Sequence, residues 1–155
     1  MALSKNSAKV QAWLDRFGLQ LEVLELAQST RTAQEAADAV GCELAQIVKS
    51  LVFRMEEKPL LFLVSGKNRL DMQKVENTLG IKLEKADAEF VREKTGFPIG
   101  GVPPVAHTTP MEVFIDRDLL EYEEVWAAAG TPHAVFRIKS NDLPKITNGS
   151  VIDVY

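Results

Sequence analysis

Residues 48–66 read VKSLVFRMEEKPLLFLVSG and contain two strand-like runs joined by a short polar turn. The first run, residues 48–55, is rich in β-branched and aromatic side chains, and the second, residues 60–65, is apolar until the chain reaches Gly66. Apolar runs of this length, bounded by turn residues, are typical of buried strands. We therefore expect a central β-hairpin, around which the rest of the chain packs.

Lys49 lies in the first strand of this hairpin, among side chains that favour burial. A lysine in such a place has two alternatives. Its long stem extends along apolar surface to the solvent, or its ammonium group projects into a cavity where it has a function. The local sequence leaves both alternatives open.

The remaining segments mix helical and strand-like patterns. Apolar spacing, capping residues and glycine stops predict helices over residues 10–17, 33–40, 43–47, 71–79, 88–95, 118–129 and 140–146. Further strands are expected over residues 19–26, 81–85, 111–116, 134–138 and 151–155. The alternation, without repeats or low-complexity linkers, predicts a single α/β domain spanning residues 1–155 and built on a mixed sheet.

The composition is that of an ordinary globular protein, because 46% of the residues are apolar and 26% are charged. The N-terminal segment carries charges within its first apolar turns, which argues against a signal peptide or a membrane span, so we expect a cytoplasmic protein without membrane contact. The net charge of −4 argues against a protein that coats long nucleic acids. It leaves open a protein that grips only a nucleic-acid end.

Few residues are suited to bind metal or to form a disulfide. Cys42 is the single cysteine, and the two histidines, His107 and His133, are not paired at short spacing with it or with each other. We expect no metal site and no cofactor. Cys42 follows a glycine at a predicted helix end, and we interpret it as a packing residue, with a nucleophilic thiol as the less favoured alternative.

Residues 95–107 read TGFPIGGVPPVAH and form an apolar stretch rich in glycine and proline. Proline fixes its own φ angle and glycine lets the backbone approach a ligand, so this stretch predicts a rigid, non-repetitive wall that presents backbone N–H groups. The alternative is a buried connector between two elements.

Four segments together resemble YbaK-type proteins and the editing domain inserted in bacterial prolyl-tRNA synthetases. They are IVKSLVF at residues 47–53, LLFLVSG at 60–66, the loop at 95–107, and AGTPHAVFRI at 129–138. The resemblance spans nearly the whole chain. It implies a single domain in which helices surround a mixed, barrel-like β-sheet.

The resemblance also implies a function. The expected activity is trans-editing: hydrolysis of the ester bond in mischarged tRNA, with tRNA for proline carrying alanine, cysteine or a similar small amino acid as the leading substrate. The partners would be the acceptor end of aminoacyl-tRNA and, as a candidate, prolyl-tRNA synthetase, and we expect a monomer. Two alternatives stay open, a non-catalytic module that binds an aminoacyl or nucleotide end, and a hydrolase of simple esters that ignores tRNA.

Site residues follow from the family motif. The motif GxxxP borders the aminoacyl pocket in that family, and the family lysine matches Lys49, the expected catalytic residue. A pocket histidine of some members falls near His133. The expected substrate-binding residues are Gly100, Gly101, Val102, Pro103, Pro104, His133, Ser65 and Gly66.

These residues suggest a mechanism for ester hydrolysis. Backbone N–H groups of Gly100, Gly101 and Val102 would stabilise the developing oxyanion, and the Lys49 ammonium would pair with a phosphate or a ribose hydroxyl of the tRNA end. No nucleophile is evident, so the 2′-hydroxyl of the terminal adenosine or the side chain of the substrate would assist. The size of the pocket would be set by Val102, Ile99 or Phe97.

Overall fold

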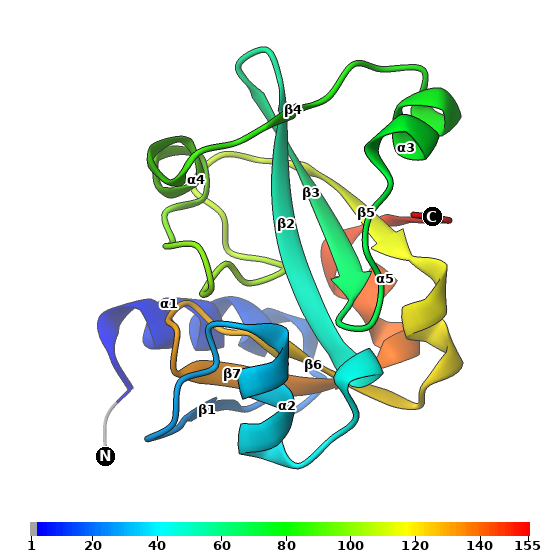
Figure 1. Cartoon of the computed structure of the whole chain (residues 1–155). Coiled ribbons are helices and arrows are strands. Elements are labelled where there is room, and N and C mark those ends of the chain that lie inside the picture. Colours follow the sequence, from blue (N-terminus) through cyan, green and yellow to red (C-terminus); the bar gives the residue numbers. More distant parts are fainter. Residues whose placement is uncertain (1–2) are drawn as a thin grey trace.

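The predicted central hairpin is confirmed. The computed structural model describes residues 3–155, so Met1 and Ala2 of the predicted 1–155 domain lie outside it. Strands β2 (Ile47–Met55) and β3 (Lys58–Ser65) pair antiparallel, from Val48 opposite Ser65 to Met55 opposite Lys58. The long hairpin runs through the middle of the molecule (Figure 1).

The hairpin belongs to a mixed sheet with the order β1-β7-β6-β2-β3-β5-β8, and β4 pairs with β2 beside this path. The other strands are β1 (Val23–Glu25), β4 (Glu84–Lys85), β5 (Glu112–Asp116), β6 (Glu124–Ala128), β7 (Ala134–Lys139) and β8 (Ser150–Ile152). The pairs β2–β6, β3–β5 and β5–β8 are parallel, and the other pairs are antiparallel. The predicted α/β fold with a mixed sheet is therefore confirmed. Within residues 3–155 the order ends at β1 and β8, so the barrel-like sheet is not closed.

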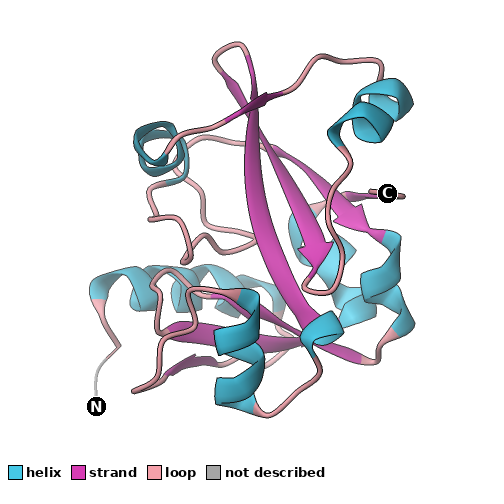
Figure 2. Cartoon of the chain, in the orientation of Figure 1, coloured by secondary structure: helices cyan, strands magenta, loops and turns pink. Residues whose placement is uncertain are grey.

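Helices lie around the sheet (Figure 2) and mostly begin and end where the capping residues predict. They are α1 (Lys5–Leu14), α2 (Ala33–Val40), α3 (Met72–Leu79), α4 (Ala88–Thr95) and α5 (Leu143–Thr147), with short 3-10 turns at Asp15–Phe17, Leu44–Gln46, Arg117–Glu121 and Ser140–Asp142. Thr32 forms the predicted capping box with Glu35, and Gly41 ends α2 in the left-handed conformation. Within the described residues 3–155, no helix is long and apolar enough to cross a bilayer.

The helix predicted over residues 118–129 is wrong. A 3-10 turn, Arg117–Glu121, is followed by strand β6, which pairs with β7 along its whole length and with β2 at two positions. In this strand Val125 and Ala127 are buried while their neighbours are half-buried. The helical spacing was misleading because pairing with two distant strands outweighs a local preference. The strands expected at 19–26, 81–85 and 151–155 are also shorter than predicted.

Both faces of the hairpin are covered by apolar clusters, which explains why β3 is continuously apolar. Leu61 and Leu63 pack into one cluster, whereas Phe62 packs into the other, where its ring stacks on Phe114 with centroids 5.0 Å apart. Because side chains of a strand alternate, the same rule holds for β2. Val48 faces the first cluster and Phe53 the second.

Candidate functional site

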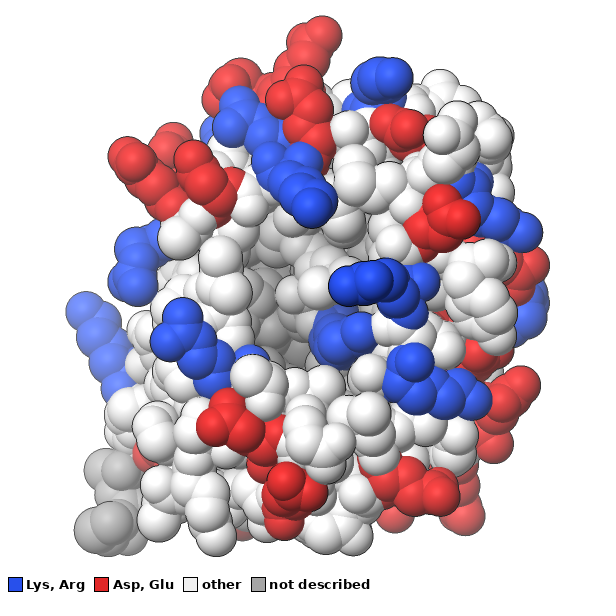
Figure 3. All heavy atoms as spheres, in the orientation of Figure 1, with Lys and Arg blue, Asp and Glu red and all other residues white. Residues whose placement is uncertain are grey.

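A pocket opens where the sheet has a gap. Strand β6 pairs with β2 only at Ile47 and Val48, and β4 pairs with it only at Phe53 and Arg54. Between these two contacts, residues 49–52 have no strand partner on this side. A pocket of about 230 Å³ opens at this gap. Figure 3 shows the corresponding hollow, with Lys and Arg side chains gathered around it.

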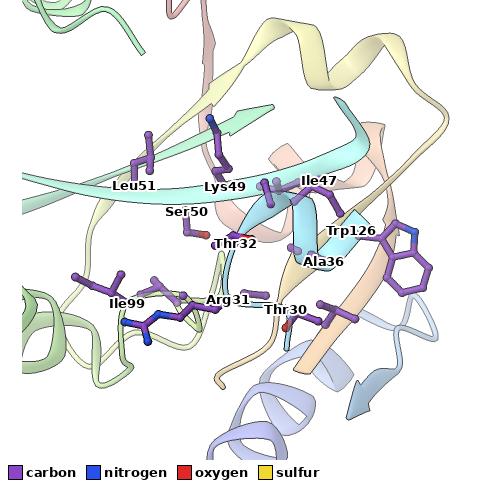
Figure 4. Close-up of a pocket in the computed structure, with 17 residues that line it drawn as sticks. Thr30, Arg31, Thr32, Ala36, Ile47, Lys49, Ser50, Leu51, Ile99 and Trp126 are labelled. Atoms are coloured by element: carbon purple, nitrogen blue, oxygen red, sulfur yellow. The ribbon is translucent and has the colours of Figure 1, made fainter. Parts of the chain in front are cut away.

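The pocket is built from segments that are far apart in the sequence (Figure 4). It is lined by Thr30, Arg31, Thr32, Ala33, Ala36, Ile47, Val48, Lys49, Ser50, Leu51, Ile99, Gly100, Val102, Trp126, Ala127, Ala128 and Val135. A second, more apolar pocket of about 240 Å³ adjoins it and shares Ser50, Leu51, Ile99 and Val102. None of the residues that line either pocket is acidic.

The loop at 95–107 contributes part of the wall. Gly100 and Val102 line the pocket, and Ile99 lies at its rim with 46% of its surface exposed. Gly101 does not line it: its N–H donates to the Pro98 carbonyl at 2.9 Å, and a Cβ atom on Gly101 would be 2.9 Å from the backbone of Thr131. Among the hydrogen bonds of residues 3–155, the amides of Gly100 and Val102 have no acceptor. The amide of Ile99, which also lines the pocket, likewise has no acceptor among these hydrogen bonds, so the loop can offer three donors: the amides of Ile99, Gly100 and Val102.

The other half of this loop lies behind the wall. Pro103 and Pro104 do not line the pocket, and the Pro103 carbonyl is 2.6 Å from Nε2 of the half-buried His107. Burial lowers the pKa of His107, which favours a neutral ring that donates to this carbonyl. Phe97, expected to set the pocket size, is instead fully buried in the core. His107 and Phe97 thus support the loop on the side that faces away from the pocket.

Lys49 borders the pocket, but its ammonium group lies on the other side of β2 from Ser50 (Figure 4). Lys49 Nζ donates to the carbonyl oxygen of Asn68. The Asn68 side chain in turn donates to Asp116 at 2.8 Å and to Asp118 at 2.9 Å. Burial lowers the pKa of Lys49, and the charge of Asp116 partly opposes this. The lysine is therefore held against the Asn68 turn, at the edge of the pocket.

Ser65 and Gly66 do not line the pocket in this structure. The Ser65 hydroxyl donates to the Ala45 carbonyl at 2.7 Å, and the Gly66 N–H donates to the Ile47 carbonyl at 2.7 Å. A Cβ atom on Gly66 would be only 2.3 Å from the Leu44 carbonyl oxygen. These contacts fix the start of β2 against the preceding 3-10 turn, and so place the strand that carries Lys49.

His133 is exposed and lies in the connection between β6 and β7, outside the residues that line the pocket. Its Nδ1 is 3.0 Å from the Gln28 carbonyl. In the same connection the Pro132 carbonyl accepts from the Thr30 N–H at 2.6 Å. The histidine therefore supports the segment that carries Thr30 into the pocket.

Sequence reasoning missed Arg31, Thr30 and Ser50. The stem of Arg31 lies across Gly100, and within residues 3–155 no carboxylate is within ion-pair distance of its guanidinium. Arg31 immediately precedes the Thr32 capping box, a position that marks a helix start but gives no sign of a ligand. Ser50 could have been found, because strand alternation directs the neighbour of Lys49 to the opposite face.

A metal centre has no obvious basis in the described part of the chain. Residues 3–155 contain no group of three or more His, Cys, Asp or Glu side chains that could hold an ion. Cys42 is half-buried and packs beside Ala36, Ala37 and Ile47. Burial raises the pKa of its thiol, so the reactive thiolate is disfavoured.

The fold and the site define a class of protein: a small mixed α/β domain whose split sheet forms a compact pocket with a cationic rim. Comparison with known families agrees with this class and narrows it. Residues 27–146 match the family described as the aminoacyl-tRNA editing domain. The chain belongs to this family.

Individual relatives are consistent with that assignment. The chain is 30% identical over 147 residues to the uncharacterized protein YwhH of Bacillus subtilis, and the match covers 94% of each. It is 35% identical over 98 residues to the proline–tRNA ligase of Maridesulfovibrio salexigens, where the match covers 63% of this chain and 17% of the ligase. A solved structure described as "a putative trans-editing enzyme for prolyl tRNA synthetase" superposes with a TM-score of 0.93 at 54% identity, covering 99% of this chain and 98% of that one.

Proposed function

We propose that the protein is a trans-editing deacylase that hydrolyses the ester bond of mischarged tRNA. The leading substrate is tRNA for proline that carries a small wrong amino acid, alanine or cysteine. The observation that carries the proposal is the pocket at the gap in the sheet, which joins a compact apolar interior to the cationic side chain of Arg31 and has Lys49 at its edge. An aminoacylated 3′ end has the matching chemistry, a small acyl group beside a phosphate backbone.

The pocket offers donors for the charge that develops during ester hydrolysis. The free amides of Gly100 and Val102 come from a loop that proline and His107 hold rigid, so they can stabilise an oxyanion without reorganisation. The amide of Gly101 is already used by Pro98. The oxyanion role is accordingly proposed for Gly100 and Val102, and Gly101 is proposed to pack the loop against Thr131.

The two cations would position the tRNA end. Arg31 and Lys49 border the same pocket, and neither forms an ion pair among the described residues. Charge-assisted hydrogen bonds from such groups to phosphate are stronger than neutral ones. Lys49 would exchange the Asn68 carbonyl for a phosphate or ribose oxygen and so hold the ester in register with the loop.

The reaction needs a group that activates water. The lining residues include hydroxyl groups but no histidine or carboxylate that could serve as a general base. We therefore propose that the substrate supplies this group, through the 2′-hydroxyl of the terminal adenosine or the amino-acid side chain. The comparison of 3′-aminoacyl substrates ending in adenosine or 2′-deoxyadenosine tests the first option, and equal rates would exclude it.

The decisive experiment is a deacylation screen over correctly and wrongly charged tRNAs, with Lys49→Ala as the control protein. We expect fast hydrolysis of a mischarged tRNA for proline, slow hydrolysis of correct pairs, and loss of activity in the variant. Binding without turnover on every tRNA would favour a non-catalytic module. Equal rates on simple aminoacyl esters would favour a hydrolase that ignores tRNA. The proposed setting is the cytoplasm, with the protein acting as a monomer and prolyl-tRNA synthetase as a candidate partner.

A further inference from the structure

We propose that Thr30 and Ser50 are the substrate-binding hydroxyls of the pocket, held without partners in the free protein and paired by polar groups of the aminoacyl-ribose end. Among residues 3–155, their two hydroxyl oxygens are the only buried side-chain polar atoms without a hydrogen-bond partner. Both residues line the pocket at the gap in the sheet. This inference rests on the proposed function and assigns the residues that would bind its substrate.

Thr30 is the more deeply buried of the two, with 5% of its surface exposed. Its backbone is fixed, because its N–H donates to the Pro132 carbonyl at 2.6 Å. Apolar residues that cannot bond to a hydroxyl, such as Ala36 and Val135, line the same pocket. A buried hydroxyl without a partner is costly and rare in folded proteins. A ligand group that pairs with it removes this cost.

Ser50 offers more than its hydroxyl. The Gly66 N–H donates to the Ile47 carbonyl, so alternation in the antiparallel ladder directs the backbone groups of Ile47, Lys49 and Leu51 toward β3. The N–H and C=O of Ser50 therefore face the gap, where β2 has no strand partner. Figure 4 shows the Ser50 side chain on the pocket side of β2. Ser50 thus presents three polar groups to one small space.

The aminoacyl-ribose end carries groups that fit this arrangement. They are the α-amino group, the ester oxygens and the free ribose hydroxyl, and each can donate to or accept from a neutral hydroxyl. Since no acidic residue lines either pocket, recognition of the amino group would use neutral acceptors. The Ser50 carbonyl and the two hydroxyls are acceptors available at the gap.

Stability measurements distinguish a binding role from a structural one. Thr30→Val and Ser50→Ala remove hydroxyls that have no partner, so the melting temperature of the free protein should stay the same or rise. Matched controls are Thr95→Val and Ser140→Ala. The Thr95 hydroxyl donates to the Val91 carbonyl at 2.7 Å, and the Ser140 hydroxyl donates to the Tyr122 carbonyl. Both controls should lower the melting temperature. An equal loss in Thr30→Val and Ser50→Ala would overturn the proposal.

Binding and turnover complete the test. The probe is 3′-deoxy-3′-(alanylamino)adenosine, whose amide link resists hydrolysis, and substrates are alanylated tRNAs for proline. We expect Thr30→Val and Ser50→Ala each to weaken probe affinity and kcat/KM by about tenfold, the effect of one lost hydrogen bond to a buried group. Ser140→Ala should leave the probe affinity and kcat/KM close to the wild-type values. Unchanged affinity in the two pocket variants would refute the assignment.

The two proposals fail in different ways. If the wild type binds the probe and the variants lose affinity, yet no charged tRNA is hydrolysed, the deacylase function fails and the binding role of the hydroxyls stands. If the wild type hydrolyses a charged tRNA and both variants match it, only the hydroxyl assignment fails. A wild-type protein that does not bind the probe also contradicts the assignment.

Discussion

The side chain of Arg31 lies across the backbone of Gly100 so closely that a Cβ atom on Gly100 would be 2.6 Å from Arg31 Cγ. Gly100 also has a φ angle of +88°, in the region that L side chains rarely adopt. The first glycine of the GxxxP motif thus has two physical roles here. It permits the turn of the loop, and it leaves room for an arginine that reaches along the pocket (Figure 4).

Gly100→Ala should therefore reduce deacylation activity by more than its loss of folding stability can explain. The left-handed φ angle costs an alanine about 1–2 kcal/mol, and the new methyl group also displaces Arg31. Gly80→Ala is the matched control, because Gly80 has a φ angle of +67° but no neighbouring atom within 4 Å of the position that a methyl group would take. Urea unfolding should show similar losses for both variants, while only Gly100→Ala loses tenfold or more in deacylation. Equal activities would contradict this role for Gly100.

Arg31→Gln should raise KM for charged tRNA by about 10- to 100-fold, the range for a lost hydrogen bond to a charged group. The dependence of KM on salt should also become shallower, because one fewer phosphate contact is made. Arg117→Gln is the control, since Arg117 pairs with the exposed Asp153 and does not line the pocket. A salt dependence that is identical in both variants would exclude a phosphate contact by Arg31.

Lys49→Met should lower kcat/KM by at least about tenfold while the fold is retained. The variant also tests the burial of the ammonium group. Burial lowers the pKa of Lys49 below 10.5, so the folded protein loses this proton before the unfolded chain does. The free energy of unfolding of the wild type, relative to Lys49→Met, should therefore rise as pH increases toward 10.5. A difference that is constant with pH would contradict the burial of this ammonium.

The half-buried His107 should make the stability of the protein depend on pH on the acidic side. Because burial lowers its pKa below 6.5, the unfolded chain binds a proton first as pH falls, and stability is lost from about pH 6.5 downward. When one proton is involved, the free energy of unfolding changes by at most about 1.4 kcal/mol per pH unit. His107→Gln keeps a donor for Pro103 and should remove this contribution, as measured by urea unfolding between about pH 5 and 7. A pH dependence of stability that this substitution does not change would contradict the role of His107 burial.

Much of the fold could be predicted because the signals are local. The Thr32 capping box, the left-handed glycines Gly41 and Gly80 and the hairpin at 48–66 depend on hydrogen bonds or burial patterns within a few residues. The helix prediction over residues 118–129 failed because the deciding contacts there are not local. Their helical spacing was overridden by pairing with β7 and β2, and no local pattern reports such distant partners.

The candidate site divides in the same way. The family motif identified Lys49, Gly100 and Val102, which all border the pocket, and their roles stay proposals. Six other residues were expected to bind the substrate, but in this structure they do not line the pocket: Gly101, Pro103, Pro104, His133, Ser65 and Gly66. Motif matching finds residues that occur together, and it does not separate a side chain that faces a ligand from one that supports it.

The sequence by itself determined the hairpin, the helix ends and a rigid glycine-proline loop, since each follows from the conformational preferences of neighbouring residues. Only the tertiary structure decided that β6 and β4 leave part of β2 unpaired, that Ser50 lies on the pocket side of β2, and that Arg31 rests on Gly100. These features depend on contacts between segments that are distant in the chain, as between Ile47 and Trp126. Their geometry is set by how the whole sheet packs, and a linear pattern does not encode it locally.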